Sequence, residues 1–148
     1  MAIIATEDDS KTISNMDRLI LTFGYGNRTN HEVFLDYLHE FNVTCVIDVR
    51  LSPRAWSRQW YKEQIEKICS YKKIKYLSKE SLGNTSGKSN WIPPDYDKAR
   101  ETLIEISKLA EVGTILLLCA EMDSSKCHRV DVACELQKLV DVPIKHLK

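Results

Sequence analysis

The side chains best suited to catalysis lie at positions 119–129, which contain two thiols, an imidazole and side chains of both charges. Cys119 ends an apolar run, and Cys127 and His128 are expected in the first turn or two of the following helix. A thiol near a helix amino terminus and beside cationic side chains has a lowered pKa, which favours the thiolate. We therefore predict Cys127 as a nucleophile or redox group, with His128 or Glu121 moving protons. The same placement predicts a buried Cys119 and an accessible Cys127.

Three other interpretations are relevant to this stretch. The spacing of Cys119, Cys127 and His128 fits no common zinc pattern, so no metal ligand and no cofactor is assigned. A tyrosine-phosphatase loop is excluded, because Ser125 stands six residues after Cys119, where that mechanism needs arginine. A purely structural strand, loop and helix stays open.

A glycine-bearing turn at residues 24–28 offers a second site for a ligand. Its two glycines let the backbone turn sharply, and the next helix amino terminus presents free N–H groups to an anion, beside Asn27. Arg28 could bind a phosphate or carboxylate group through two parallel hydrogen bonds. The spacing matches neither a dinucleotide fingerprint nor a Walker phosphate loop. A plain turn before a helix with a capping box, formed by Thr29 and Glu32, is equally compatible.

Asp48 and Arg50 close another apolar run. An acid at a strand end is able to act as a base or metal ligand. Side chains two apart on a strand point the same way, however, and a structural ion pair is the more common outcome.

Cations and aromatic rings alternate after this run, without an intervening acid. Cations contact phosphates and aromatic rings stack on bases, which is how single strands and nucleotides are held. The alternative is a solvated basic loop whose tryptophans pack into the domain edge. The residues concerned are Arg50, Arg54, Trp56, Arg58, Trp60, Tyr61 and Lys62.

The elements that position these residues alternate between apolar runs and helical periodicity. Strands are predicted near residues 19–23, 43–48, 74–77, 115–119 and 143–146, and helices near 29–41, 61–71, 99–110 and 125–140. This alternation predicts a three-layer α/β/α fold with a mostly parallel sheet of about five strands. In open α/β sheets ligands bind beyond the carboxyl ends of the strands, and nearly all the candidate residues fall there.

Length and composition limit the class of protein. The chain has 148 residues, of which 43% are hydrophobic and 28% charged, as expected for one globular domain at residues 18–148 after a flexible tail at 1–17. No apolar run is long enough for a membrane span and no signal peptide is visible, so a cytoplasmic protein is expected. Its five cysteines are therefore interpreted as thiols. Because 21 basic and 21 acidic residues cancel, attraction to phosphate must come from a local patch.

Four motifs, in order, resemble the domain of unknown function 488 family. They are residues 23–28 (FGYGNR), 46–54 (VIDVR followed by PR), 82–83 (LG) and 118–129 (LCAE followed by CHR). The match runs from about residue 19 to residue 140. Tyr25 stands where histidine is frequent in the family, and Asn84 where a second glycine is frequent. The resemblance implies a cytoplasmic α/β domain of bacteria or archaea and supplies no reaction.

The preferred hypothesis is a pocket at the carboxyl edge of the sheet that binds a phosphate-bearing ligand, either a nucleotide or a nucleic-acid end. In its most specific form, this hypothesis makes the protein an enzyme that uses a thiol. The alternative is a non-catalytic module that binds nucleic acid or a protein partner. The candidate chemical groups are Asp48, Glu121, Cys127 and His128, and the candidate ligand contacts are Asn27, Arg28, Arg50, Arg54, Trp56, Trp60 and Arg129.

Overall fold

A computed structural model of the chain describes residues 18–121 and 127–148. The predicted tail at residues 1–17 and the start of the last predicted helix lie outside the described residues. All five predicted strands are confirmed, and they form one parallel sheet in the order β4-β3-β5-β2-β6. The strands are β2 (Ile20–Gly24), β3 (Val43–Asp48), β4 (Lys75–Ser78), β5 (Thr114–Cys119) and β6 (Ile144–His146).

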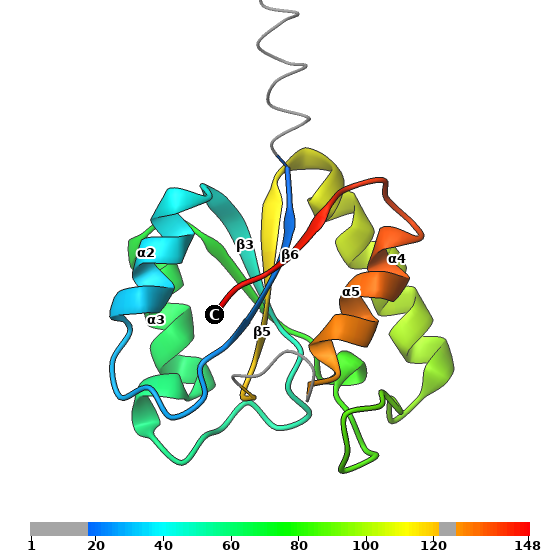
Figure 1. Cartoon of the computed structure of the whole chain (residues 1–148), viewed down its shortest axis with the longest axis horizontal. Helices are drawn as coiled ribbons and strands as arrows, with labels where there is room; N and C mark the ends of the chain where they lie inside the picture. The colour runs from blue at the N-terminus through cyan, green and yellow to red at the C-terminus, as the bar shows by residue number, and fades with distance from the viewer. Residues whose placement is uncertain (1–17, 122–126) are drawn as a thin grey trace, which may run out of the picture.

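Helices cover both faces of this sheet (Figure 1). One face carries α2 (Glu32–Glu40) and α3 (Lys62–Tyr71), and the other carries α4 (Tyr96–Val112) and α5 (Arg129–Gln137). Two short 3₁₀ helices, η1 (Arg58–Trp60) and η2 (Glu80–Leu82), lie in the loops after β3 and β4. The predicted three-layer fold is confirmed. Among the described residues, no helix is both long and apolar enough to cross a membrane.

The central strand β5 shows why the sheet is buried on both sides. All six of its residues are buried, as the continuous apolar run predicts for a parallel strand. Successive side chains point to opposite faces. Ile115 and Leu117 join the core under α4 and α5, whereas Leu116 and Leu118 join the core under α2 and α3.

The amino-terminal ends of two helices differ from the sequence prediction. The capping box of Thr29 and Glu32 is wrong, because α2 begins at Glu32 and the side chain of Asn30 accepts the Glu32 N–H at 3.0 Å. The last helix begins at Arg129, so Cys127 and His128 precede it and do not lie in its first turn. Both residues are therefore held by the end of a loop.

Gly24 ends β2 where the main chain passes against the segment after β5. A Cβ atom at this position would collide with the main-chain carbonyl of Glu121 and with the guanidinium of Arg129. Only glycine permits such a close approach of two backbones. The sequence thus needs glycine here to bring the ends of β2 and β5 together.

We predict that Gly24→Ala lowers the free energy of unfolding by about 1–3 kcal/mol, because the added methyl group overpacks this contact. Urea denaturation measures the loss. The double variant Gly24→Ala/Glu121→Ala should not recover stability, since the nearest obstacle is a main-chain oxygen. Recovery in the double variant would show that the Glu121 side chain is the obstacle.

Candidate functional site

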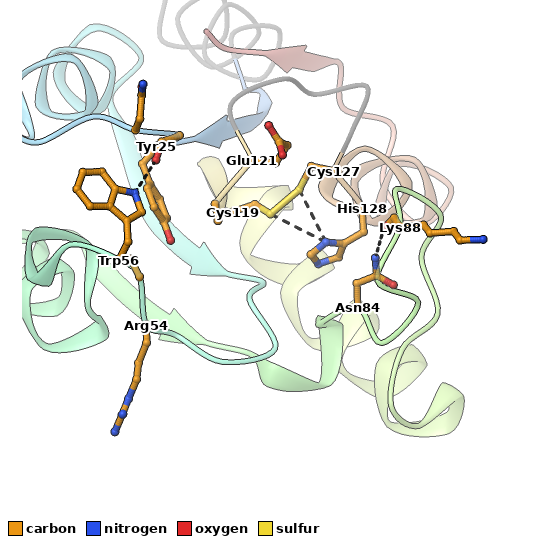
Figure 2. A pocket seen from close by; sticks show the side chains of 13 residues that line it. Tyr25, Arg54, Trp56, Asn84, Lys88, Cys119, Glu121, Cys127 and His128 are labelled. Carbon is orange, nitrogen blue, oxygen red and sulfur yellow. Dashed lines mark hydrogen bonds between the residues drawn. A yellow bond between two sulfur atoms is a disulfide. The ribbon is translucent and has the colours of Figure 1, made fainter.

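A pocket of about 790 Å³ opens at the carboxyl edge of the sheet (Figure 2). Its lining comes from the loops after β2, β3, β4 and β5, as expected for an α/β sheet of this topology. The lining residues are Tyr25, Gly26, Asn27, Arg54, Ala55, Trp56, Asn84, Lys88, Cys119, Ala120, Glu121, Cys127 and His128.

Main-chain hydrogen bonds continue the sheet ladder into these loops. The N–H groups of Tyr25 and Gly26 donate to the carbonyls of Cys119 (3.2 Å) and Ala120 (2.8 Å). Gly26 has a φ of 58°, a left-handed conformation that favours glycine and turns the chain away from the strand. The loops after β2 and β5 are thereby fastened to each other below the pocket.

Asp48 and Arg50 form a buried bidentate ion pair beside the pocket. Arg50 Nε and Nη2 donate to the two carboxylate oxygens of Asp48 at 2.8 and 2.6 Å. Arg50 Nη1 donates to the carbonyl of Trp60 at 2.7 Å and to the hydroxyl of Tyr25 at 3.3 Å. Tyr76 donates to Asp48 at 2.5 Å. The structural ion pair is the alternative that the structure supports, and neither Asp48 nor Arg50 lines the pocket.

The pKa values in this network follow from burial and charge. Burial alone lowers the pKa of Arg50, but the hydrogen bonds and charge of Asp48 outweigh it and raise that pKa above its usual value. Burial raises the pKa of Tyr25. Burial, and then the Asp48 charge, raises the pKa of Tyr76. Arg50 therefore stays charged and both phenols stay neutral at physiological pH.

Two further arginines are also bound to oxygens of the protein. Arg28 Nη1 donates to the carbonyl of Gly24 at 2.9 Å, and its guanidinium lies over the ring of Phe23. Arg129 is fully buried and donates to the main-chain carbonyl of Glu121. Of the four arginines predicted to grip phosphate, only Arg54 lines the pocket.

The two predicted stacking tryptophans have different environments. Trp60 is 0% exposed, and its ring stacks on Tyr25 with centroids 4.8 Å apart. The prediction that Trp60 stacks on a base is wrong, because its buried ring has no face free for a ligand. Trp56 is 66% exposed, and its indole N–H donates to the carbonyl of Gly26 at 3.3 Å. This bond places the Trp56 ring on the pocket wall next to Tyr25 (Figure 2).

Sequence reasoning missed Asn84 and Lys88 on the opposite wall. The side chain of Asn84 holds its loop: its amide donates to the Lys88 carbonyl at 2.7 Å, and its oxygen accepts from Ser86 and Ile92. Lys88 is exposed. The available signal was their place in a long polar loop after the third strand, at the same edge of the sheet as the other candidates.

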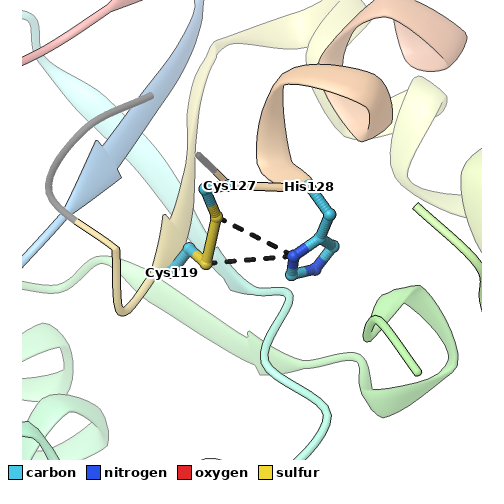
Figure 3. A group of neighbouring side chains, drawn as sticks. All are labelled: Cys119, Cys127 and His128. Carbon is cyan, nitrogen blue, oxygen red and sulfur yellow. Dashed lines mark hydrogen bonds between the residues drawn. A yellow bond between two sulfur atoms is a disulfide. The ribbon is translucent and has the colours of Figure 1, made fainter. Parts of the chain in front are cut away.

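Cys119 and Cys127 are joined by a disulfide at the base of the pocket (Figure 3). The interpretation of all five cysteines as thiols is therefore wrong for this pair. Cys127 is 6% exposed, so its predicted accessibility is also wrong. The residue precedes α5, which begins at Arg129, and does not lie on an open helix turn. As a disulfide sulfur, Cys127 has no thiolate to act as a nucleophile.

His128 lies against both sulfur atoms. Its Nδ1 is 4.0 Å from Cys119 Sγ and 3.8 Å from Cys127 Sγ, and its Nε2 is 2.9 Å from the carbonyl of Val49. A carbonyl only accepts, so Nε2 carries the proton. Burial lowers the pKa of His128, which favours the neutral ring. The unprotonated Nδ1 of that ring faces the sulfur pair.

The remaining cysteines are free thiols in contrasting surroundings. Burial raises the pKa of Cys45 to about 11 and that of Cys69 to about 12. Both lie in the core, whereas Cys134 is exposed on α5. Of the three, Cys134 alone is placed to react with a reagent in solution.

The fold and the pocket define an α/β protein with an all-parallel sheet and a pocket at its carboxyl edge. The sequence matches the family described as "Domain of unknown function DUF488" over residues 30–136, and the chain belongs to this family. No curated protein and no solved structure matches the chain.

We predict that Arg50→Ala lowers the free energy of unfolding by about 3–5 kcal/mol, because it leaves the Asp48 charge buried without its partner. Asp48→Asn/Arg50→Met removes both charges and should cost less. The matched control is Arg54→Ala, an exposed arginine of the same loop, which should stay within about 0.5 kcal/mol of the parent. Equal losses in Arg50→Ala and Arg54→Ala, measured by urea denaturation, would contradict this assignment.

Thiol counting tests the cysteine assignment. Iodoacetamide should alkylate the folded, oxidised chain once, at Cys134, and the variant Cys134→Ser not at all. In urea without a reductant three sites should react, because Cys45 and Cys69 become exposed while the disulfide persists. Addition of a reductant should raise the count to five. Five labels in urea alone would show that Cys119 and Cys127 are not joined.

Proposed function

We propose that the pocket binds a small phosphate-bearing ligand, with a nucleotide as the best-fitting class. The observation that carries this proposal is the composition of the pocket walls: a cation and an exposed tryptophan on one side, and a cation and an amide on the other. A volume of about 790 Å³ is in the range of small-molecule sites, which run from about 300 to 1,000 Å³.

Arg54 and Lys88 are the groups for phosphate. Both are exposed, and among residues 18–121 and 127–148 no ion pair joins either of them to an acid. Figure 2 shows their charged ends extending outward on opposite sides of the pocket. Long, solvated side chains of this kind are able to turn toward an incoming anion, at the cost of side-chain entropy.

Trp56 supplies the stacking face. Its ring is largely exposed, yet the hydrogen bond to Gly26 holds it in place, so little ordering is needed when a base stacks on it. Glu121 and Asn27 line the same pocket and are available for hydroxyl or amino groups of the ligand. An aromatic face and separate phosphate contacts together suit a nucleotide better than a free phosphate ion.

Calorimetry with AMP and with inorganic phosphate tests the proposal. Arg54→Ala and Lys88→Ala should each weaken AMP binding roughly tenfold, as for loss of a charged hydrogen bond. Trp56→Ala should weaken AMP but leave phosphate unchanged, because phosphate has no ring to stack. Binding should also weaken with salt, since both cations are exposed.

The control is Arg58→Ala, which removes an exposed cation of the same loop outside the pocket. It should leave AMP binding unchanged. Failure of both AMP and phosphate to bind, or an equal loss in Arg58→Ala, would overturn the assignment of this pocket.

A second candidate is a non-catalytic module for single-stranded nucleic acid. It is favoured by the exposed ring of Trp56 between two exposed cations, Arg54 and Arg58. Such a module should bind oligonucleotides with a steep salt dependence, and Arg58→Ala should then weaken binding as much as Arg54→Ala. The same control variant therefore separates the two functions.

A further inference from the structure

Three soft or borderline donor atoms converge at the base of the pocket. Cys119 Sγ, Cys127 Sγ and His128 Nδ1 all lie within 4.8 Å of one another. Cys119 comes from the end of β5, and the other two immediately precede α5 (Figure 3). All three are buried, yet each lines the pocket. This combination gives a preformed cluster with access from one side.

The neighbouring main chain orients these donors as it does around metal ligands. Nε2–H of His128 donates to the carbonyl of Val49, which directs the free Nδ1 toward the two sulfurs. A metal-binding histidine almost always donates its other ring N–H in this way. The N–H of Arg129 donates to Cys127 Sγ at 3.5 Å, an interaction that stabilises a thiolate.

The sulfur-to-nitrogen separations fit tetrahedral coordination, and the two sulfurs, which are bonded to each other in this structure, would move apart after reduction. Bonds of about 2.3 Å to sulfur and 2.0–2.1 Å to nitrogen at a tetrahedral angle place the two donors roughly 3.6 Å apart. The observed sulfur-to-Nδ1 distances are 3.8 and 4.0 Å. The Cα atoms of the two cysteines are 7.4 Å apart. This exceeds the usual disulfide range of about 4.4–6.8 Å, so the two sulfurs are able to separate around an ion once their bond is reduced.

We propose that the reduced chain binds one Zn²⁺ ion through Cys119, Cys127 and His128. Thiolate and imidazole donors select zinc or a similar thiophilic cation, and Mg²⁺ and Ca²⁺ prefer oxygen. Three protein ligands leave a fourth coordination position, which is available to water or to a ligand atom. This arrangement is typical of catalytic zinc sites, whereas structural sites have four protein ligands.

Oxidation state controls this site. A dithiol reductant transfers two electrons and two protons to the disulfide, which yields two thiols in the protein and a disulfide in the reductant. Zinc then displaces one proton from each thiol as the two sulfur–metal bonds form. In the oxidised form the sulfurs are bonded to each other, so no thiolate is available for the ion.

Cobalt(II) and zinc binding to the full chain tests the proposal without a nucleotide, so it does not rest on the proposed function. After reduction with a phosphine and its removal, Co²⁺ should give thiolate-to-metal charge-transfer absorption and the visible bands of a tetrahedral ion. One equivalent of Zn²⁺ should abolish them. The oxidised chain should show neither the charge-transfer absorption nor the visible bands of cobalt. Metal analysis after gel filtration should find one zinc per reduced chain.

Matched variants identify the ligands. Cys127→Ser and His128→Ala should weaken Zn²⁺ binding at least 10–100-fold, the loss typical of even an outer-shell partner. Cys134→Ser, which removes the exposed thiol of α5, should leave it unchanged. Circular dichroism of each sample verifies the fold. If the folded, reduced parent chain gives no cobalt–thiolate absorption, or Cys134→Ser abolishes it, the proposal is wrong.

Discussion

The buried ion pair of Asp48 and Arg50 is the interaction on which the candidate site depends. Burying two charges costs several kcal/mol each, which is recovered only when good geometry and further hydrogen bonds satisfy both groups. Here the pair is bidentate, and Arg50 also binds the carbonyl of Trp60 and the hydroxyl of Tyr25. These contacts tie the loop after β3 to the loop after β2. The wall that carries Trp56 is therefore rigid at its base.

Burial and hydrogen bonding separate the arginines at this edge into those that stabilise the protein and those that are available to a ligand. Arg28, Arg50 and Arg129 all satisfy oxygens of the protein itself, and the last two are buried. Arg54, four residues beyond Arg50, is exposed. In the proposed function, attraction of an anion therefore rests on Arg54 and Lys88 and not on every cation that the sequence contains at this edge.

Physical reasons explain what the sequence predicted and what it did not. The strands were predicted correctly because a strand buried on both faces is a continuous apolar run, and a pocket lies at the edge of the sheet where the parallel topology predicts one. Arg50 and Arg54 could not be told apart, because spacing does not reveal which loop folds over a side chain. Cys127 was misplaced because no periodic pattern in the sequence before Arg129 marks where α5 begins. Its pairing with Cys119 was not predicted, because spacing along the chain does not reveal which side chains meet.

The two states of the cysteine pair differ in chemistry more than in charge. A disulfide is neutral, and one Zn²⁺ ion bound by two thiolates and a neutral imidazole is also neutral. In the proposed function, long-range attraction of an anion by Arg54 and Lys88 would therefore be the same in both states. What would change is the group at Cys119, Cys127 and His128: the proposed zinc ion would offer a coordination position that a phosphate or water oxygen is able to fill. The oxidation state of the pair would thus decide whether the pocket only binds its ligand or also polarises it.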